Sequence, residues 1–290
     1  MKPAAFDYYA PSTFDEALAL LDSQRDKAVI LAGGQSLVPL MNFRLARPAT
    51  VIDINRLSEL SYIRIEGGVM RIGALTRHAD LEESDLVSGA LPLLREAVKF
   101  VGHAQIRNRG TVGGSVSHAD PAAELPTVFV ALGARFHVAS STQRRAIAAD
   151  EFFVDAFMTA LRPGELLVEI EIPLLPSGSG TSFVEFARRH GDFAIGGACA
   201  ALSLGNDDSC TRARLVLLAA GPRPTRVQTA ESALTGSRLN DDVLDVSAKL
   251  AAEAAQPTGD IHGSRAYRLH LLRVMARRAL ETARDRARAA

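Results

Sequence analysis

Two Gly-Gly motifs, far apart in the sequence, contain the residue types that could hold a phosphate group. The first is Ala32-Gly33-Gly34-Gln35-Ser36 and the second is Thr111-Val112-Gly113-Gly114-Ser115. Glycine lets a backbone approach a ligand closely, and consecutive N–H groups in such a turn can bind phosphate oxygens without a lysine. Either motif alone is more often a tight turn with no ligand. The presence of both motifs favours phosphate binding more than either motif does alone.

Other phosphate-binding and catalytic motifs do not occur in the chain. Its Gly178-Ser179-Gly180 has no third glycine at the Rossmann spacing, and no P-loop pattern is present. A kinase, an NTPase or a simple NAD-dependent dehydrogenase is therefore disfavoured. No HExxH motif, Ser-His-Asp order or paired carboxylates point to hydrolysis, so we assign no catalytic residue and no metal ligand.

Composition narrows the function classes further. The 33 Lys and Arg residues balance the 33 Asp and Glu residues, so no net charge attracts the protein to nucleic acid or an anionic membrane. Two cysteines, Cys199 and Cys210, are too few for an iron–sulfur cluster. The N-terminal ten residues do not resemble a signal peptide, and the longest uncharged run, Ala194–Leu204, is too short to span a bilayer. We expect a soluble cytoplasmic protein whose thiols are reduced.

The first half of the chain alternates helical and strand patterns. Ser/Thr-x-x-Asp/Glu pairs within Pro11–Glu16 predict an N-capped helix, and the first glycine motif follows a short apolar strand. Leu91, Leu94, Val98 and Val101 have helical spacing, and a polar loop is expected over His103–Gly110. The further segments predicted here are strands at Ala28–Leu31, Thr50–Ile54, Val69–Leu75, Arg135–Ala139 and Leu166–Pro173, and a helix at Pro121–Leu132.

Pro176–Gly180 is typical of a boundary, and strands followed by helices after it predict a small α+β domain. The strands are expected at Ser182–Arg188, Ala194–Leu204 and Arg214–Ala220, and the helices at Thr229–Leu234, Asp241–Ala255 and Ser264–Arg288. The last helix carries eight arginines, for which a solvated face is favoured over docking to an acidic partner.

The segment Gly102–Pro126, together with Ala32–Ser36 and Leu40–Arg44, closely resembles the FAD-binding medium subunits of bacterial molybdenum hydroxylases. This family includes the flavoprotein components of carbon monoxide dehydrogenase, quinoline oxidoreductase, nicotine dehydrogenase and xanthine dehydrogenase. The resemblance extends from Phe6 to about Arg278 and includes further short matches at Ile72-Gly73-Ala74, Gly164-Glu165-Leu166 and Phe186-Ala187-Arg188-Arg189.

The resemblance implies an α+β fold in two domains. Residues 1–175 would form a vanillyl-alcohol-oxidase (PCMH)-type FAD-binding domain of two α/β subdomains, about 1–57 and 58–175. Residues 176–290 would form a C-terminal α+β domain with a three-stranded antiparallel sheet and helices.

The resemblance also implies a set of FAD-binding residues. They are Ala32, Gly33, Gly34, Gln35, Ser36, Leu37, Gly102, Thr111, Gly113, Gly114, Ser115, His118, Asp120, Glu124, Leu166, Leu167 and Phe193. Asp120 could instead be a helix N-cap and Glu124 a first-turn charge, and the two leucines could be ordinary strand core. Phe193 stands where many relatives have Tyr or Ile, so a role for a hydroxyl there is in doubt.

Among the histidines, His103 and His118 are the ones close to the glycine motifs in sequence. Non-covalent FAD is favoured over attachment through His118, because the most similar family binds FAD non-covalently. For Arg107 and Arg109, a solvated position is favoured over a contact with phosphate or a partner.

The function implied is that of an FAD-binding subunit in a cytoplasmic molybdenum hydroxylase. A small partner subunit would carry [2Fe–2S] clusters and a large one the molybdenum cofactor, assembled as a dimer of heterotrimers. Electrons would pass through FAD to an external acceptor. Two alternatives remain open: a self-contained flavin oxidase or reductase, and a non-catalytic scaffold that has lost FAD.

Overall fold

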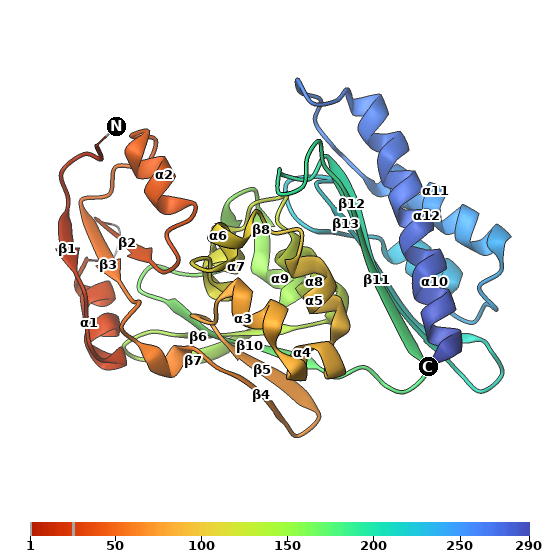
Figure 1. The fold of residues 1–290 in the computed structure, drawn as a ribbon, viewed down its shortest axis with the longest axis horizontal. Helices are drawn as coiled ribbons and strands as arrows, with labels where there is room; N and C mark the ends of the chain where they lie inside the picture. Colours follow the sequence, from red (N-terminus) through yellow and green to blue (C-terminus); the bar gives the residue numbers. More distant parts are fainter. Residues whose placement is uncertain (1, 25–26) are drawn as a thin grey trace.

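The computed structural model describes residues 2–24 and 27–290, which form three parts along the chain (Figure 1). Each part has its own main sheet. We call them the N-terminal part (residues up to 57), the middle part (58–175) and the C-terminal part (176–290). The middle part lies between the other two, so each of them can contact it from its own side.

The N-terminal part is a small α/β unit. Its three strands are parallel, in the order β1-β3-β2, and the buried Ile52 lies in the central strand. The Thr13 hydroxyl accepts a hydrogen bond from the Glu16 N–H (3.3 Å) at the start of the first helix, as the capping pattern predicts. The elements are β1 (Asp7–Tyr9), α1 (Phe14–Gln24), β2 (Ala28–Leu31), α2 (Leu37–Asn42) and β3 (Thr50–Asp53).

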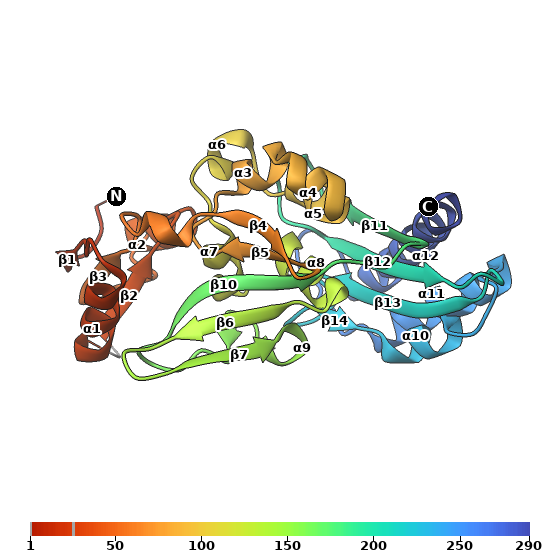
Figure 2. The same cartoon turned by 90° about the horizontal axis from the view of Figure 1, so that it is seen from below.

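The middle part is an antiparallel sheet with helices on one face (Figure 2). The strand order is β4-β5-β10-β6-β7. In β10, Ile170 and Ile172 enter the core, while Glu169 and Glu171 lie on the opposite face, as alternation requires. Its elements are η2 (Ser58–Leu60), β4 (Ile63–Glu66), β5 (Val69–Gly73), α3 (His78–Glu83), α4 (Asp85–Ala90), α5 (Pro92–Val98), α6 (Ala104–Arg107), α7 (Val112–His118), α8 (Glu124–Leu132), β6 (Arg135–Ala139), β7 (Arg144–Ala148), α9 (Ala149–Phe152), β8 (Phe153–Asp155), β9 (Met158–Thr159) and β10 (Leu166–Pro173).

Two predictions for the middle part are wrong in detail. The polar loop over His103–Gly110 contains the short helix α6, because the His103 carbonyl accepts from the N–H groups of Ile106 and Arg107. The helix predicted from Pro121 begins at Glu124 instead. A turn closed by the Ala123 N–H and the Asp120 carbonyl (3.0 Å) occupies the intervening residues.

The C-terminal part is a sheet with helices on its outer face. Helix α12 lies along β11 and β12, and the opposite face of the sheet packs on α5 and α8 (Figure 1). The expected three strands are joined by a fourth, two-residue strand that is too short to show periodicity. The elements are β11 (Ser179–Phe186), β12 (Gly196–Leu204), β13 (Cys210–Leu218), β14 (Thr225–Arg226), α10 (Gln228–Leu234), α11 (Asp241–Ala254) and α12 (Arg265–Ala289).

The arginines of α12 are less solvated than predicted. Arg268 is 7% exposed and donates hydrogen bonds to the Ile195 carbonyl and to Asp260, each at 2.8 Å. Arg286 pairs with Glu96 of the middle part at 2.7 Å. Several of these cations therefore bind groups of this same chain. In the part of the chain described, no helix has the length and hydrophobicity needed to cross a membrane.

Candidate FAD-binding cleft

A cleft of about 730 Å³ lies where the three parts meet. Its size is within the ~300–1,000 Å³ usual for cofactor sites. It is lined by residues of the N-terminal part, the middle part and the segment 191–193 before β12. All the residues predicted to bind FAD line it: Ala32, Gly33, Gly34, Gln35, Ser36, Leu37, Gly102, Thr111, Gly113, Gly114, Ser115, His118, Asp120, Glu124, Leu166, Leu167 and Phe193.

The first glycine motif offers free backbone donors. It connects the end of β2 to α2, and Gly34 has a left-handed backbone (φ +74°) that favours glycine. Within the described residues, no acceptor takes the N–H groups of Gly33, Gly34, Gln35 and Ser36. Four consecutive free donors beside a cleft are suited to binding an anionic group.

The second glycine motif is the first turn of α7, and the prediction that it forms a similar open turn is wrong. Thr111 is the N-cap, and its hydroxyl accepts from the Gly114 N–H at 3.1 Å. The N–H groups of Val112 and Gly113 donate to the carbonyls of Thr76 (2.9 Å) and Ala74 (2.8 Å). This motif therefore presents mainly side-chain donors, such as the hydroxyl of Ser115, to the cleft.

Contacts within the protein already require glycine at these positions, before any ligand is considered. A Cβ on Gly33 would lie 2.4 Å from the Arg109 carbonyl oxygen, and one on Gly113 would lie 2.6 Å from the Ala74 Cβ. A Cβ on Gly114 would lie 2.7 Å from the Thr111 hydroxyl and 3.9 Å from the Ala32 Cβ. The glycines thus let the two motifs approach each other, and a side chain at 114 would enter the space between them.

The alternative considered for Asp120 is wrong, whereas the one considered for Glu124 is confirmed. The N-cap of α8 is Ala123, not Asp120, whose carboxylate instead accepts from the Ala122 N–H at 2.9 Å. Glu124 lies in the first turn of α8, is 8% exposed and lines the cleft. Burial raises its pKa to about 7, and the charge of Asp120 adds to this effect. Near neutral pH, Glu124 can donate or accept a hydrogen bond.

A second carboxyl beside Glu124, that of the half-buried Glu185, was not found from the sequence. It lies on the same face of β11 as Phe183, which packs into the core shared with the middle part. Its Oε2 atom has no partner among the described residues. Burial raises the pKa of Glu185 to about 8, and the charge of Glu124 raises it further. A glutamate in a strand carries no sequence signal that it will face another acid.

Leu166 and Leu167, at the start of β10, were considered either as cofactor contacts or as strand core. They are 3% and 2% exposed, and they line the cleft while belonging to the core. Phe193 is 74% exposed at the rim of the cleft. An exposed phenyl ring at a rim can pack on an entering ligand but offers no hydroxyl.

The histidine nearest the second motif is one that the sequence did not indicate. His78, at the start of α3, is buried, and its Nε2 lies 3.0 Å from the Thr111 carbonyl oxygen. Burial lowers its pKa to about 4, so the ring is neutral near neutral pH. His118 also lines the cleft, with its ring 5.1 Å from that of Phe157. His103 and His118 are near the motifs in sequence, and the fold adds His78 to them.

Arg107 is not solvated, contrary to the interpretation favoured from the sequence. Its guanidinium donates to Glu82 at 2.7 Å and to the carbonyls of Val101 and Gly102 at 3.3 and 3.2 Å. These bonds hold the segment that carries Gly102 at the cleft. Arg109 is exposed, as expected.

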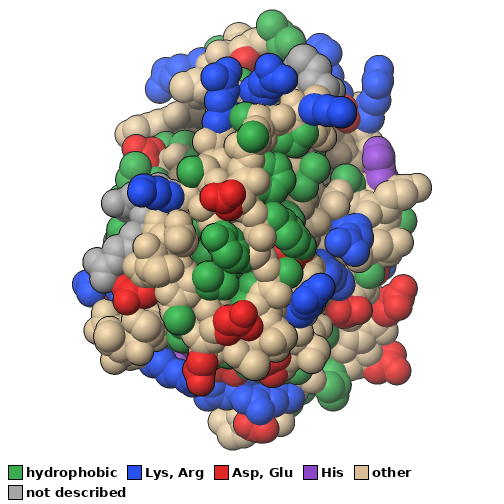
Figure 3. Space-filling view, turned by 90° about the vertical axis from the view of Figure 1, so that its left-hand side faces the viewer, with side chains coloured by type: hydrophobic (Ala, Val, Ile, Leu, Met, Phe, Trp, Pro, Cys, Tyr) green, Lys and Arg blue, Asp and Glu red, His purple; other side chains and the backbone are tan. Residues whose placement is uncertain are grey.

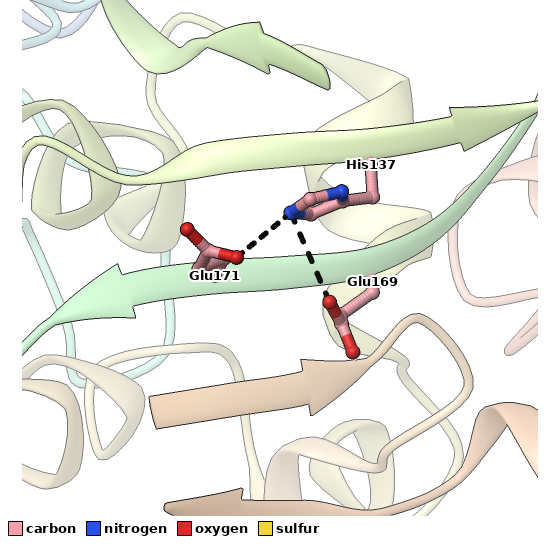
Figure 4. Close-up of side chains that lie close together, drawn as sticks. All are labelled: His137, Glu169 and Glu171. Carbon is pink, nitrogen blue, oxygen red and sulfur yellow. Dashed lines mark hydrogen bonds and ion pairs between the residues drawn. The ribbon is translucent and has the colours of Figure 1, made fainter. Parts of the chain in front are cut away.

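Among the described residues, His137, Glu169 and Glu171 are spaced as metal ligands could be (Figure 4). His137 Nε2 lies 3.1 Å from Glu171 and 3.8 Å from Glu169. However, Arg71 binds both carboxylates, at 2.6 and 2.7 Å, through the same oxygens that face the histidine. Because a cation already neutralises these oxygens, the cluster has the chemistry of a salt-bridge network.

The comparisons with known proteins cover nearly the whole chain. Residues 4–175 match the family described as "FAD binding domain in molybdopterin dehydrogenase", and residues 181–283 match "CO dehydrogenase flavoprotein C-terminal domain". The chain is 46% identical to the 6-hydroxypseudooxynicotine dehydrogenase complex subunit alpha of Paenarthrobacter nicotinovorans, covering 99% of this chain and 97% of that one.

Two solved structures are similar in fold as well as in sequence. One is carbon monoxide dehydrogenase from Hydrogenophaga pseudoflava lacking the Mo-pyranopterin moiety of its cofactor, with a TM-score of 0.96, 37% identity and 99% of each chain covered. The other is quinoline 2-oxidoreductase from Pseudomonas putida 86, with a TM-score of 0.93, 38% identity and 99% of each chain covered.

Proposed function

This chain belongs to the family of FAD-binding flavoprotein subunits of molybdenum-containing dehydrogenases, and from that membership we propose its place in an electron-transfer complex. It is an oxidoreductase component with FAD as its cofactor. In our proposal, the chain receives electrons from [2Fe–2S] clusters on a small partner subunit. It passes them through non-covalently bound FAD to an external acceptor, while a large molybdenum subunit hydroxylates the substrate.

The observation that carries this proposal is the cleft between the two glycine motifs. The free N–H groups of Gly33–Ser36 suit the pyrophosphate of FAD, and the Ser115 hydroxyl approaches from α7. Glu124 suits the sugar hydroxyls, because a carboxyl with a pKa of about 7 can both donate and accept hydrogen bonds. When bound, FAD supplies storage of two electrons that can be exchanged singly.

This chain's own residues act by binding and orienting. The described part of the cleft has no nucleophile paired with a base, and its one histidine with a shifted pKa, His78, is bonded to a backbone carbonyl. Leu166 and Leu167 exclude water from one wall, and Phe193 can cover the open side. A subunit that only relays electrons needs no more than this.

Two observations support assembly with partner subunits. Cys199 and Cys210 are both buried, on β12 and β13, so neither is available to a cluster. Hydrophobic side chains gather in the middle of the N-terminal end of the molecule (Figure 3), and contiguous apolar surface is typical of protein contacts. The large side chains exposed in this part are Phe6, Tyr8, Tyr9, Val29, Val38, Phe43 and Leu45. We propose a dimer of heterotrimers with the small and large subunits.

We also propose the boundaries of the domain that binds FAD. Residues 1–175 would form the FAD-binding domain, with subdomains of about 1–57 and 58–175, and residues 176–290 a separate C-terminal domain. The C-terminal part has a core of its own, whereas the core of the N-terminal part also includes Leu75 and Leu166 of the middle part, which supports this division. The core that Phe183 and Val216 share with the middle part would hold the C-terminal domain against it.

The visible absorption spectrum of the full chain, purified alone and with its partner subunits, tests the proposal. We expect flavin bands in the chain alone, and bleaching by substrate only when the partners are present. Bleaching of the chain alone would instead make it a self-contained flavin oxidase or reductase. A colourless chain that does not take up added FAD would make it a scaffold.

Substitution of a glycine tests the placement of FAD. Gly114→Val puts a side chain between the two motifs, and we expect the purified protein to lose its flavin. Gly89→Val is the matched control, because Gly89 also lies in a short helix, and a Cβ there meets nothing within 4 Å. A Gly114→Val protein that stays as yellow as the control would refute this placement.

A further inference from the structure

The two glycine motifs belong to different parts of the chain, so contacts between these parts must fix the position of one motif relative to the other. The first follows β2 of the N-terminal part, and the second starts α7 of the middle part. At Gly33 the two backbones are so close that there is no room for a Cβ beside the Arg109 carbonyl. A close contact of this kind fixes distance but not the orientation of the peptide groups.

Asn55 fixes the backbone of the first motif through a hydrogen bond to its first carbonyl. It follows β3, and its side-chain Nδ2 donates to the Ala32 carbonyl at 2.7 Å. Asp53 fixes this amide, since its Oδ1 accepts from both the Asn55 N–H (2.9 Å) and Nδ2 (2.6 Å). The Tyr8 hydroxyl donates to the other oxygen of Asp53 at 2.7 Å. The Asn55 Oδ1 is then left to accept a bond from elsewhere.

Arg77 supplies that bond and connects it to the second motif. Its Nη2 donates to Asn55 Oδ1 at 2.7 Å, and its Nη1 donates to the Arg109 carbonyl at 2.5 Å. The Arg77 backbone is itself fixed, because its N–H donates to Asp80 at 2.9 Å and it forms a β-bridge with Thr111. A continuous hydrogen-bonded path therefore runs from the Ala32 carbonyl to the Arg109 carbonyl.

One end of this path is the peptide group between Ala32 and Gly33, whose N–H lies on the side of the cleft. The Ala32 carbonyl and the Gly33 N–H belong to one planar peptide, in which they point in opposite directions. Holding the carbonyl therefore aims the N–H, which has no acceptor among the described residues. A bond chain that begins at a guanidinium also polarises this peptide and strengthens its donor. Neither Arg77 nor Asn55 lines the cleft, so both would act through the backbone.

We propose that Arg77 is a positioning residue for FAD, which acts through Asn55 to aim the Gly33 N–H at the pyrophosphate and to hold the two glycine motifs together. The inference rests on the proposed location of FAD between these motifs. It assigns a binding role to two side chains that do not touch the cofactor.

The test is the affinity of the full-length apo-chain for added FAD, measured by the quenching of flavin fluorescence. We expect Arg77→Met to raise the Kd about tenfold, the effect of losing roughly one hydrogen bond from a charged donor. Arg77→Lys should restore FAD affinity only in part, because a single ammonium group cannot donate to both acceptors as the two Nη atoms of the guanidinium do. Thermal unfolding of each apo-chain is recorded in parallel.

Arg226→Met is the matched control for a general loss of stability. Arg226 is also half-buried, and it binds Glu231 and Asp150 in a region away from the cleft. We expect it to lower the unfolding temperature while leaving the Kd for FAD unchanged. If it weakens FAD as much as Arg77→Met does, the effect of Arg77 is only structural and the inference is wrong.

A double-mutant cycle isolates the path itself. If Arg77 acts through Asn55, Arg77→Met combined with Asn55→Ala should weaken FAD binding no more than the stronger single variant does. Fully additive losses would overturn the inference. So would an unchanged Kd in Arg77→Met when Gly114→Val has lost its flavin. If both variants retain FAD, the proposed location of FAD has failed rather than the role of Arg77 alone.

Discussion

The half-buried carboxyl of Glu185 should make the free energy of unfolding of the apo-chain depend on pH, and one substitution should remove this dependence. Its pKa is raised from the ordinary 4.5 to about 8 by burial and by the charge of Glu124. Between these two values the folded protein holds a proton that the unfolded chain releases. Stability is therefore complete below about pH 4.5 and falls as pH rises toward 8, at up to ~1.4 kcal/mol per pH unit.

Glu185→Gln keeps the shape of the protonated side chain and abolishes the titration. After a discount for the incomplete burial of this residue, we expect the variant to exceed the wild type in stability by less than ~1 kcal/mol near pH 5. It should exceed the wild type by about 2–3 kcal/mol near pH 8. Urea unfolding at intervals between pH 5 and pH 8.5 measures this difference. Glu253→Gln, at an exposed glutamate of α11, is the control. A constant difference between wild type and Glu185→Gln across this range would refute the reasoning.

Three further predictions concern the helix cap, the core and the cleft. Thr111→Ala removes the cap of α7, and urea unfolding should show a loss of about 1 kcal/mol, whereas an unchanged midpoint would argue against the cap. Phe136→Ala should cost about 3–5 kcal/mol by the same assay, because the buried ring packs against three other phenylalanines; a loss below ~1 kcal/mol would contradict this packing. Glu124→Gln should abolish a weakening of FAD binding in the wild type above about pH 7, measured by fluorescence titration; a wild-type affinity that does not change with pH would contradict this.

Regular periodicity explains why much of the fold could be predicted. The alternation of Leu166–Pro173 and the capping pattern before α1 specify their elements locally, and β10 and α12 begin within a residue of the expected positions. The prediction errors occur where contacts between residues far apart in the sequence determine the local structure. Thr111–Ser115 has the composition of a turn, but the Ala74 and Thr76 carbonyls accept from its N–H groups and fix it as the start of a helix. Two-residue β14 is too short to show a period.

The lining of the candidate cleft could be predicted from the two motifs and the family resemblance. The residues that support this lining could not, because they have no local pattern. Arg77, His78 and Asn55 reach the motifs through a β-bridge and through side chains that lie far away in the sequence. Glu185 comes from the C-terminal part, and alternation places it on an inner face without indicating that another carboxyl lies there. A single sequence reports the residues of a motif, whereas tertiary contacts determine which side chains orient it.

The cleft combines free backbone donors with an acid, which would be unfavourable if that acid were charged. A carboxylate at Glu124 would repel the two negative charges of a pyrophosphate in the same cleft, and burial would reduce the screening of that repulsion. Burial also raises the pKa of Glu124 to about 7, so that near neutral pH the acid can hold a proton and donate a hydrogen bond. A bound dianion would raise this pKa further, and FAD would then bind together with a proton. The neutral net charge of the chain fits the same logic, because in the proposed site neutral N–H and hydroxyl dipoles, rather than an excess of cations, would hold the anion.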